Sequence, residues 1–169
     1  MQLNEKFGLI SLLLRYPEEE LKNIVKSIDI SEIDEDGLIE VLDYYKKEPL
    51  FEIQKEYVKS FDMNERSSLY LTYHKFKDDP KRGNYLARLV EYYREKGFEF
   101  VDNELPDFLP IILEFVSYID EETGIKVLQA FSKELNQIYK GLLEVDSKFT
   151  PLIDFILKNI EIMEVKQND

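Results

Sequence analysis

The segment 104–115, Glu-Leu-Pro-Asp-Phe-Leu-Pro-Ile-Ile-Leu-Glu-Phe, constrains the fold most, because prolines and acids mark the entrance to an otherwise apolar run. Asp107 can accept hydrogen bonds from the free backbone N–H groups of a helix that begins at Phe108. Pro110 falls in the first turn, where its missing N–H has no partner to lose. Residues 109–116 are apolar on every side except for one glutamate, so this helix is predicted to lie at the centre of the fold.

That glutamate, Glu114, is the one carboxylate on the predicted central helix. Acidic side chains are rarely buried without a partner. Two interpretations stay open at this point. Glu114 either faces a gap to solvent or caps a neighbouring helix, or it belongs to a binding surface.

Helical spacing of apolar residues dominates the rest of the chain, and no stretch alternates cleanly enough to indicate a strand. We therefore predict an all-α fold, a helical bundle of roughly nine helices in a single domain spanning residues 1–169. The clearest helix follows Asp79, a natural N-cap. Pro80 would occupy its first position and Gly97 would end it, with Leu89 and Tyr93 on its apolar stripe.

Composition excludes several classes of function. The chain has 169 residues, a formal charge of −13, 11 Phe, 11 Tyr and no Cys. The absence of cysteine excludes disulfides, thiolate nucleophiles and cysteine-ligated metal. The negative charge argues against nucleic acid or anionic lipid as a partner and favours a basic one. No window approaches the roughly 20 apolar residues that span a bilayer, so no direct membrane insertion is expected and the cytoplasm is the simplest location.

Few residues suggest catalysis. His74 is the only histidine, and neither Ser67 nor Ser68 has the setting of a nucleophile. A helical di-metal site would need a Glu three residues before its His, where this chain has Leu71. Glycine-rich phosphate loops are also missing. We therefore expect no catalytic residues, no metal site and no bound cofactor.

The tyrosines of residues 68–74 suggest binding more than the charges do. Tyr70 and Tyr73 lie three residues apart and would share one face of a helix, with His74 beside it. Such rigid aromatic side chains with polar tips suit a peptide groove. Tyrosines also pack readily inside proteins, so a core position with satisfied hydroxyls is the open alternative.

Lys81 and Arg82 stand at the start of a predicted helix, where positive charge is unfavourable. These cations therefore need an ionic partner or a ligand, unless they simply face water. The carboxylates that could serve are Asp62, Glu65, Asp78 and Glu104.

Four motifs follow one another along the chain: Phe61-Asp62, then Ser68-Leu-Tyr-Leu-Thr-Tyr-His74, then Lys81-Arg82-Gly83, then Glu104-Leu-Pro-Asp-Phe-Leu-Pro110 with Leu113-Glu-Phe115. Together they resemble the NarJ/TorD family of molybdoenzyme assembly chaperones. The resemblance begins at Leu-Leu-Arg-Tyr-Pro17 and continues more loosely to the end of the chain. The nitrate reductase branch fits best, because Asp107 is followed by Phe108 and not by the histidine common elsewhere in the family.

The resemblance implies a TorD-like helical chaperone that is not an enzyme. Its client would be the catalytic molybdenum subunit of respiratory nitrate reductase, held by its N-terminal segment while the molybdenum cofactor is inserted and membrane docking is delayed. Proteins that deliver the cofactor are further partners that the resemblance suggests. The residues that the resemblance assigns to the client-binding face are Asp62, Tyr70, Tyr73, His74, Lys81, Arg82, Gly83, Glu104, Pro106, Asp107, Phe108, Pro110 and Glu114.

On this interpretation a client helix lies in a groove, with Asp107 and Glu114 meeting its basic residues and Tyr73 or Phe108 serving as an aromatic anchor. Two alternatives stay open. The client could be another molybdopterin oxidoreductase of the same superfamily, or the chain could be a non-catalytic helical adaptor for an unrelated protein.

Overall fold

In the computed structural model, which describes residues 1–168, the helix α7 (Leu109–Tyr118) lies at the centre of the fold. Seven of its ten residues are buried, and α1 (Leu3–Leu13) packs along it. The hydroxyl of Ser11 on α1 donates to the carbonyl of Pro110, 2.5 Å away, in the first turn of α7. The predicted central helix is therefore confirmed, beginning one residue later than expected.

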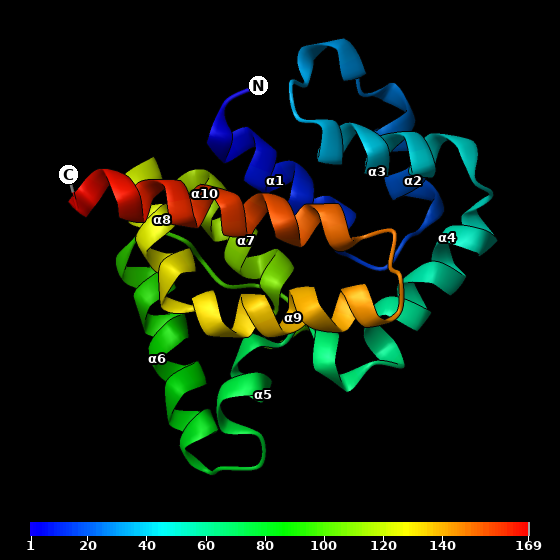
Figure 1. Ribbon diagram of the computed structural model, residues 1–169. Coiled ribbons are helices and arrows are strands. Elements are labelled where there is room, and N and C mark those ends of the chain that lie inside the picture. The colour runs from blue at the N-terminus through cyan, green and yellow to red at the C-terminus, as the bar shows by residue number, and fades with distance from the viewer. Residues whose placement is uncertain (169) are drawn as a thin grey trace.

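The described residues form ten α-helices and no strand, which confirms the all-α prediction (Figure 1). Besides α1 and α7, the helices are α2 (Glu19–Ser27), α3 (Asp36–Lys47), α4 (Leu50–Tyr57), α5 (Leu71–Phe76), α6 (Lys81–Glu95), α8 (Glu121–Ala130), α9 (Ser132–Glu144) and α10 (Thr150–Asn168). Short helical turns are η1 (Ile30–Glu32), η2 (Val58–Asp62) and η3 (Glu65–Ser67). Within residues 1–168, no helix is both long enough and apolar enough to cross a bilayer.

Of the remaining helices, α8 packs on α7. α9 and α10 lie side by side, and α10 also contacts α3 and α8 (Figure 1). α2 packs on α3, whereas α5 and α6 extend together away from the ends of the chain (Figure 1). Leu152, Ile156 and Ile160 of α10 are buried and form the apolar stripe of this helix.

Two distant segments are joined in an unexpected way. Residues 69–71 and 107–109 run antiparallel and form an isolated bridge between Tyr70 and Phe108. The N–H of Leu109 donates to the carbonyl of Leu69 at 2.8 Å, and the N–H of Leu71 donates to the carbonyl of Asp107 at 3.2 Å. The bridge fixes the second and fourth family motifs against each other.

The expected punctuation of α6 is largely confirmed. A carboxylate oxygen of Asp79 accepts from the N–H of Lys81 at 2.9 Å, so this aspartate caps the helix. Pro80 stands just before the first helical residue instead of at it. Gly97 follows the last turn with φ +80°, a conformation that glycine adopts without strain.

Candidate functional site

A surface hollow of about 430 Å³ gathers four of the residues singled out from the sequence. We call it the acidic hollow, and its walls come from the end of α1, the end of α4 with η2, and the bridged segments 68–70 and 104–108. Its lining residues are Arg15, Tyr16, Glu18, Tyr57, Phe61, Asp62, Ser68, Leu69, Tyr70, Glu104 and Phe108. Of the predicted site residues, it brings together Asp62, Tyr70, Glu104 and Phe108.

One wall of the acidic hollow is aromatic because α4 passes into the π-helical turn η2. Such π-helical turns are rare in proteins overall, but those that occur are often found at functional sites. The ring of Tyr57 packs edge-on against Tyr16 with centroids 5.6 Å apart, and it also packs against the ring of Phe61 at 4.9 Å. The Tyr57 hydroxyl donates to the carbonyl of Leu14 at 2.9 Å, which ties this wall to α1.

The opposite wall rests on the bridge between the two motifs. The rings of Tyr70 and Phe108 stack at 5.0 Å, and the Tyr70 hydroxyl donates to a carboxylate oxygen of Glu104. Burial, reinforced by this bond and the negative charge of Glu104, raises the pKa of Tyr70. A tyrosine phenol is already protonated at neutral pH, and here it donates to the Glu104 carboxylate and orients it.

The hollow is electrostatically negative. Glu18, Asp62 and Glu104 line it against one cation, Arg15, which already lies 3.3 Å from Asp102. Partial burial and the nearby carboxylate of Glu104 raise the pKa of Asp62. A cation entering the hollow would relieve this repulsion, so the site favours a basic group among aromatic rings.

The structure gives Asp107 a different role from the one predicted from the sequence, in which it capped the helix that follows it and met basic residues of the client. Its side chain is wholly buried and cannot meet a client. One carboxylate oxygen accepts from the N–H of Thr72 at 2.9 Å and from its hydroxyl at 2.6 Å. Asp107 thus caps the start of α5 across the bridge, not the helix α7 that follows it in sequence, because the antiparallel pairing directs it towards α5.

The partner of Arg82 also differs from the prediction. Arg82 donates through Nε to the Thr72 hydroxyl at 2.8 Å and lies 3.7 Å from Asp107. None of the four carboxylates proposed from the sequence pairs with it among the described residues. Lys81 is exposed at the start of α6. Arg82, Thr72 and Asp107 therefore form a structural cluster behind the hollow.

Tyr73 and His74 lie outside the acidic hollow. They line a separate hollow with Arg66 and residues of α9, whereas Tyr70 precedes α5 and points to the acidic hollow. The prediction that Tyr70 and Tyr73 share one helix face is therefore wrong, because α5 begins only at Leu71.

The other predicted site residues are dispersed. Pro106 and Pro110 are buried, and the Pro106 carbonyl accepts from the Tyr93 hydroxyl at 2.7 Å. Glu114 is half-exposed and lies 3.6 Å from Arg15, so it faces solvent beside a partner in the segment that follows α1. Gly83 is exposed, with no atom near the position of an added Cβ.

Seven lining residues of the hollow were missing from the sequence-based set, among them Arg15, Tyr16 and Phe61. A signal existed for some of them. Arg15 and Tyr16 belong to the Leu-Leu-Arg-Tyr-Pro17 motif, and Phe61 precedes Asp62 in another motif. The described residues hold no cluster of three or more His, Asp or Glu side chains suited to a metal ion.

Comparison with known proteins places this chain in a family. Residues 30–150 match the nitrate reductase delta subunit family. The "Probable nitrate reductase molybdenum cofactor assembly chaperone NarJ" of Bacillus subtilis strain 168 is 29% identical over 96% of this chain and 91% of its own length. The "Nitrate reductase molybdenum cofactor assembly chaperone NarJ" of Escherichia coli K12 is 27% identical over 89% of this chain and 67% of its own.

The fold has a solved counterpart. The structure described as "Crystal Structure Of A Putative Redox Enzyme Maturation Protein From Archaeoglobus Fulgidus" superposes with a TM-score of 0.71, and the match covers 95% of both chains at 22% identity. That structure supports the helical architecture, and the family match covers most of the chain. The chain therefore belongs to the nitrate reductase delta subunit family, the group of NarJ-like molybdoenzyme assembly chaperones.

Proposed function

We propose that this protein is a nitrate reductase assembly chaperone whose acidic hollow binds the N-terminal segment of the catalytic molybdenum subunit before that subunit is complete. The names of its relatives support the chaperone role. The convergence of Asp62, Tyr70, Glu104 and Phe108 from three of the family motifs carries the assignment of the site.

The chemistry of the hollow defines the segment that fits it. Aromatic rings on two walls offer apolar contact to one face of an amphipathic helix. Asp62, Glu18 and Glu104 offer carboxylates to a Lys or Arg beside that face. The Tyr70 hydroxyl fixes the position of Glu104, so one of these carboxylates is held in place before binding.

Binding of this kind would let the protein act as a chaperone without catalysing a reaction. While the hollow holds the N-terminal segment, the segment is withheld from other contacts, and docking at the membrane is delayed until the molybdenum cofactor is in place. The protein would work in the cytoplasm, where proteins that deliver the cofactor could reach the same client. The cofactor is cargo for the client in this scheme and needs no site on the chaperone.

Calorimetric titration tests the proposal. The ligand is a peptide of about 20 residues from the start of the catalytic subunit, long enough for a helix of about 30 Å. We expect micromolar binding that weakens as salt is raised, since charge pairs in a surface hollow are screened. The double variant Asp62→Asn with Glu104→Gln should weaken binding by about tenfold, equivalent to about 1.4 kcal/mol.

A matched control carries the same type of change outside the hollow. Glu91→Gln with Glu95→Gln alters two exposed carboxylates on α6 and should leave affinity unchanged. Equal weakening by both pairs would indicate a general effect of net charge. No binding by a folded wild-type protein would remove this segment as a sufficient ligand.

A further inference from the structure

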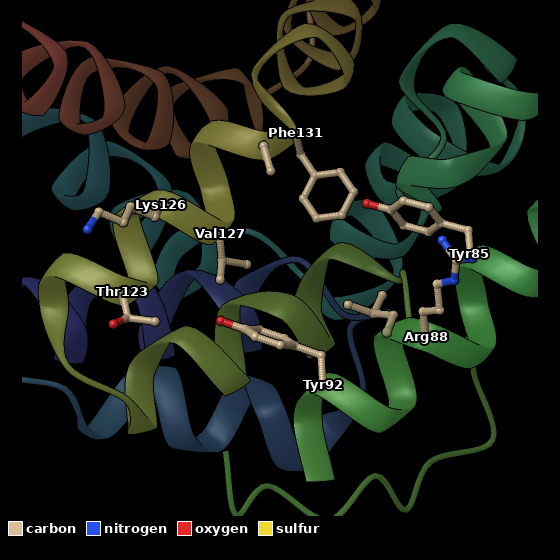
Figure 2. A pocket seen from close by; sticks show the side chains of 9 residues that line it. Tyr85, Arg88, Tyr92, Thr123, Lys126, Val127 and Phe131 are labelled. Carbon is tan, nitrogen blue, oxygen red and sulfur yellow. The ribbon is translucent and has the colours of Figure 1, made fainter. Parts of the chain in front are cut away.

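A second hollow of about 450 Å³ lies between α6 and α8, well separated in sequence from the motifs that form the acidic hollow (Figure 2). We call it the α6–α8 groove. Its lining residues are Tyr85, Arg88, Leu89, Tyr92, Thr123, Lys126, Val127, Ala130 and Phe131. None of them was singled out as a site residue from the sequence.

The two sides of the groove are helical ridges of equal length. On α6, the lining residues Tyr85, Leu89 and Tyr92 follow i, i+4, i+7 spacing. On α8, the lining residues Thr123, Val127 and Ala130 follow the same spacing. Each ridge covers about two turns, or about 10 Å. Phe131 closes one end with its ring 6.3 Å from that of Tyr85 (Figure 2). This shape accepts a short helix lying between two helices.

The charge along the groove is opposite to that of the rest of the molecule. Arg88 stands on one side and Lys126 on the other, and no carboxylate lines the groove. Among the described residues Arg88 has no ion pair, and Lys126 pairs with one carboxylate, that of Glu122 on its own helix, at 2.7 Å. The chain carries −13 overall, yet residues 66–96 hold eight Lys and Arg against four Asp and Glu.

We propose that the α6–α8 groove is a docking surface for an amphipathic helix of a partner protein, with an apolar face and acidic residues along its flanks. The apolar side chains of Leu89 and Val127 receive the apolar face, and Arg88 and Lys126 pair with the acidic flanks. The acidic hollow selects the opposite charge, so the two surfaces take different ligands and can be occupied together. A groove with two walls favours a helix over a flat lipid surface.

Fluorescence anisotropy with two synthetic helices tests this proposal. One labelled peptide carries Leu at i, i+4 and i+7 with Glu on both flanks, and the other replaces every Glu by Lys. We expect the acidic peptide to bind about tenfold or more tightly than the basic one, which corresponds to at least about 1.4 kcal/mol. Arg88→Glu should abolish this preference.

Two further variants complete the design. Arg94→Glu makes the same charge change on an exposed part of α6 outside the groove, and it should leave the preference intact. Ala130→Gln fills the groove without adding charge and should weaken binding of the acidic peptide. Because Ala130 is exposed, this variant should fold like the wild type, which circular dichroism checks.

Several results would overturn the proposal. The proposal fails if the two peptides bind equally, or if Arg88→Glu and Arg94→Glu reduce the preference for the acidic peptide equally. It also fails if the protein binds phosphatidylglycerol vesicles but not the acidic peptide, or if it self-associates and Arg88→Glu abolishes that self-association. The client peptide gives an independent check, because it should bind Arg88→Glu as it binds the wild type. If Arg88→Glu instead lost binding of the client peptide, the client segment would belong in this groove and the acidic hollow would be without its proposed ligand.

Discussion

Replacing Asp107 by alanine should destabilise the protein more than the loss of an ordinary helix cap. The carboxylate accepts two hydrogen bonds from the buried Thr72 and lies 3.7 Å from Arg82. Alanine would leave the Thr72 N–H without an acceptor inside the protein and Arg82 without its carboxylate. Each buried donor left unpaired costs about 1–3 kcal/mol, so a total of about 3 kcal/mol is expected.

Urea denaturation followed by circular dichroism measures this loss. For a slope of about 1–3 kcal/mol/M, the midpoint should fall by about 1–3 M. Asp120→Ala is the matched control, since Asp120 caps α8 through the N–H of Thr123 at 2.9 Å but is exposed. Exposed caps are typically worth about 1 kcal/mol. If Asp107→Ala lowered the free energy of unfolding no more than Asp120→Ala does, the argument that Asp107 is a buried cap would be refuted.

Three other predictions follow from the site and its surroundings. The raised pKa of Asp62 means that the native state holds its proton more tightly than the unfolded chain, so stability falls as pH rises above the ordinary value of 3.8. Asp62→Asn should therefore raise Tm at pH 7 but not at pH 3, and a loss of Tm at pH 7 would contradict this. Tyr70→Ala should weaken client-peptide binding by about 1–4 kcal/mol, whereas Tyr73→Ala should change it by less than about 0.5 kcal/mol in calorimetry. Gly141→Ala should lower stability by about 1–3 kcal/mol in urea melts, because its Cβ would lie 2.9 Å from the Arg66 backbone, whereas the unobstructed Gly83→Ala should raise it by about 0.5–1 kcal/mol.

The sequence predicted those parts of the fold that depend on local chemistry. The apolar run after the prolines correctly predicted a central helix, and Asp79 and Gly97 marked the limits of α6. Such signals lie within one helix and its two ends. They can be read without knowing what packs against the helix.

The site was predicted less completely because it depends on contacts between distant segments. The bridge between Tyr70 and Phe108 joins residues 38 positions apart, and it directs Asp107 to Thr72 and away from any client. Local spacing could not reveal this pairing, so a buried cap resembled a surface acid in the sequence. The same bridge separates Tyr70 from Tyr73, which spacing alone had placed together.

Site-specific photocrosslinking to the apo catalytic subunit tests the central claim most directly. A benzophenone amino acid replaces Tyr16 at the rim of the acidic hollow, Ala130 in the α6–α8 groove, or Tyr118 on an exposed surface outside both. The account predicts a crosslink from position 16 to the N-terminal segment of the client, and none to that segment from positions 118 and 130. A crosslink to that segment from position 130 in place of position 16 would contradict it.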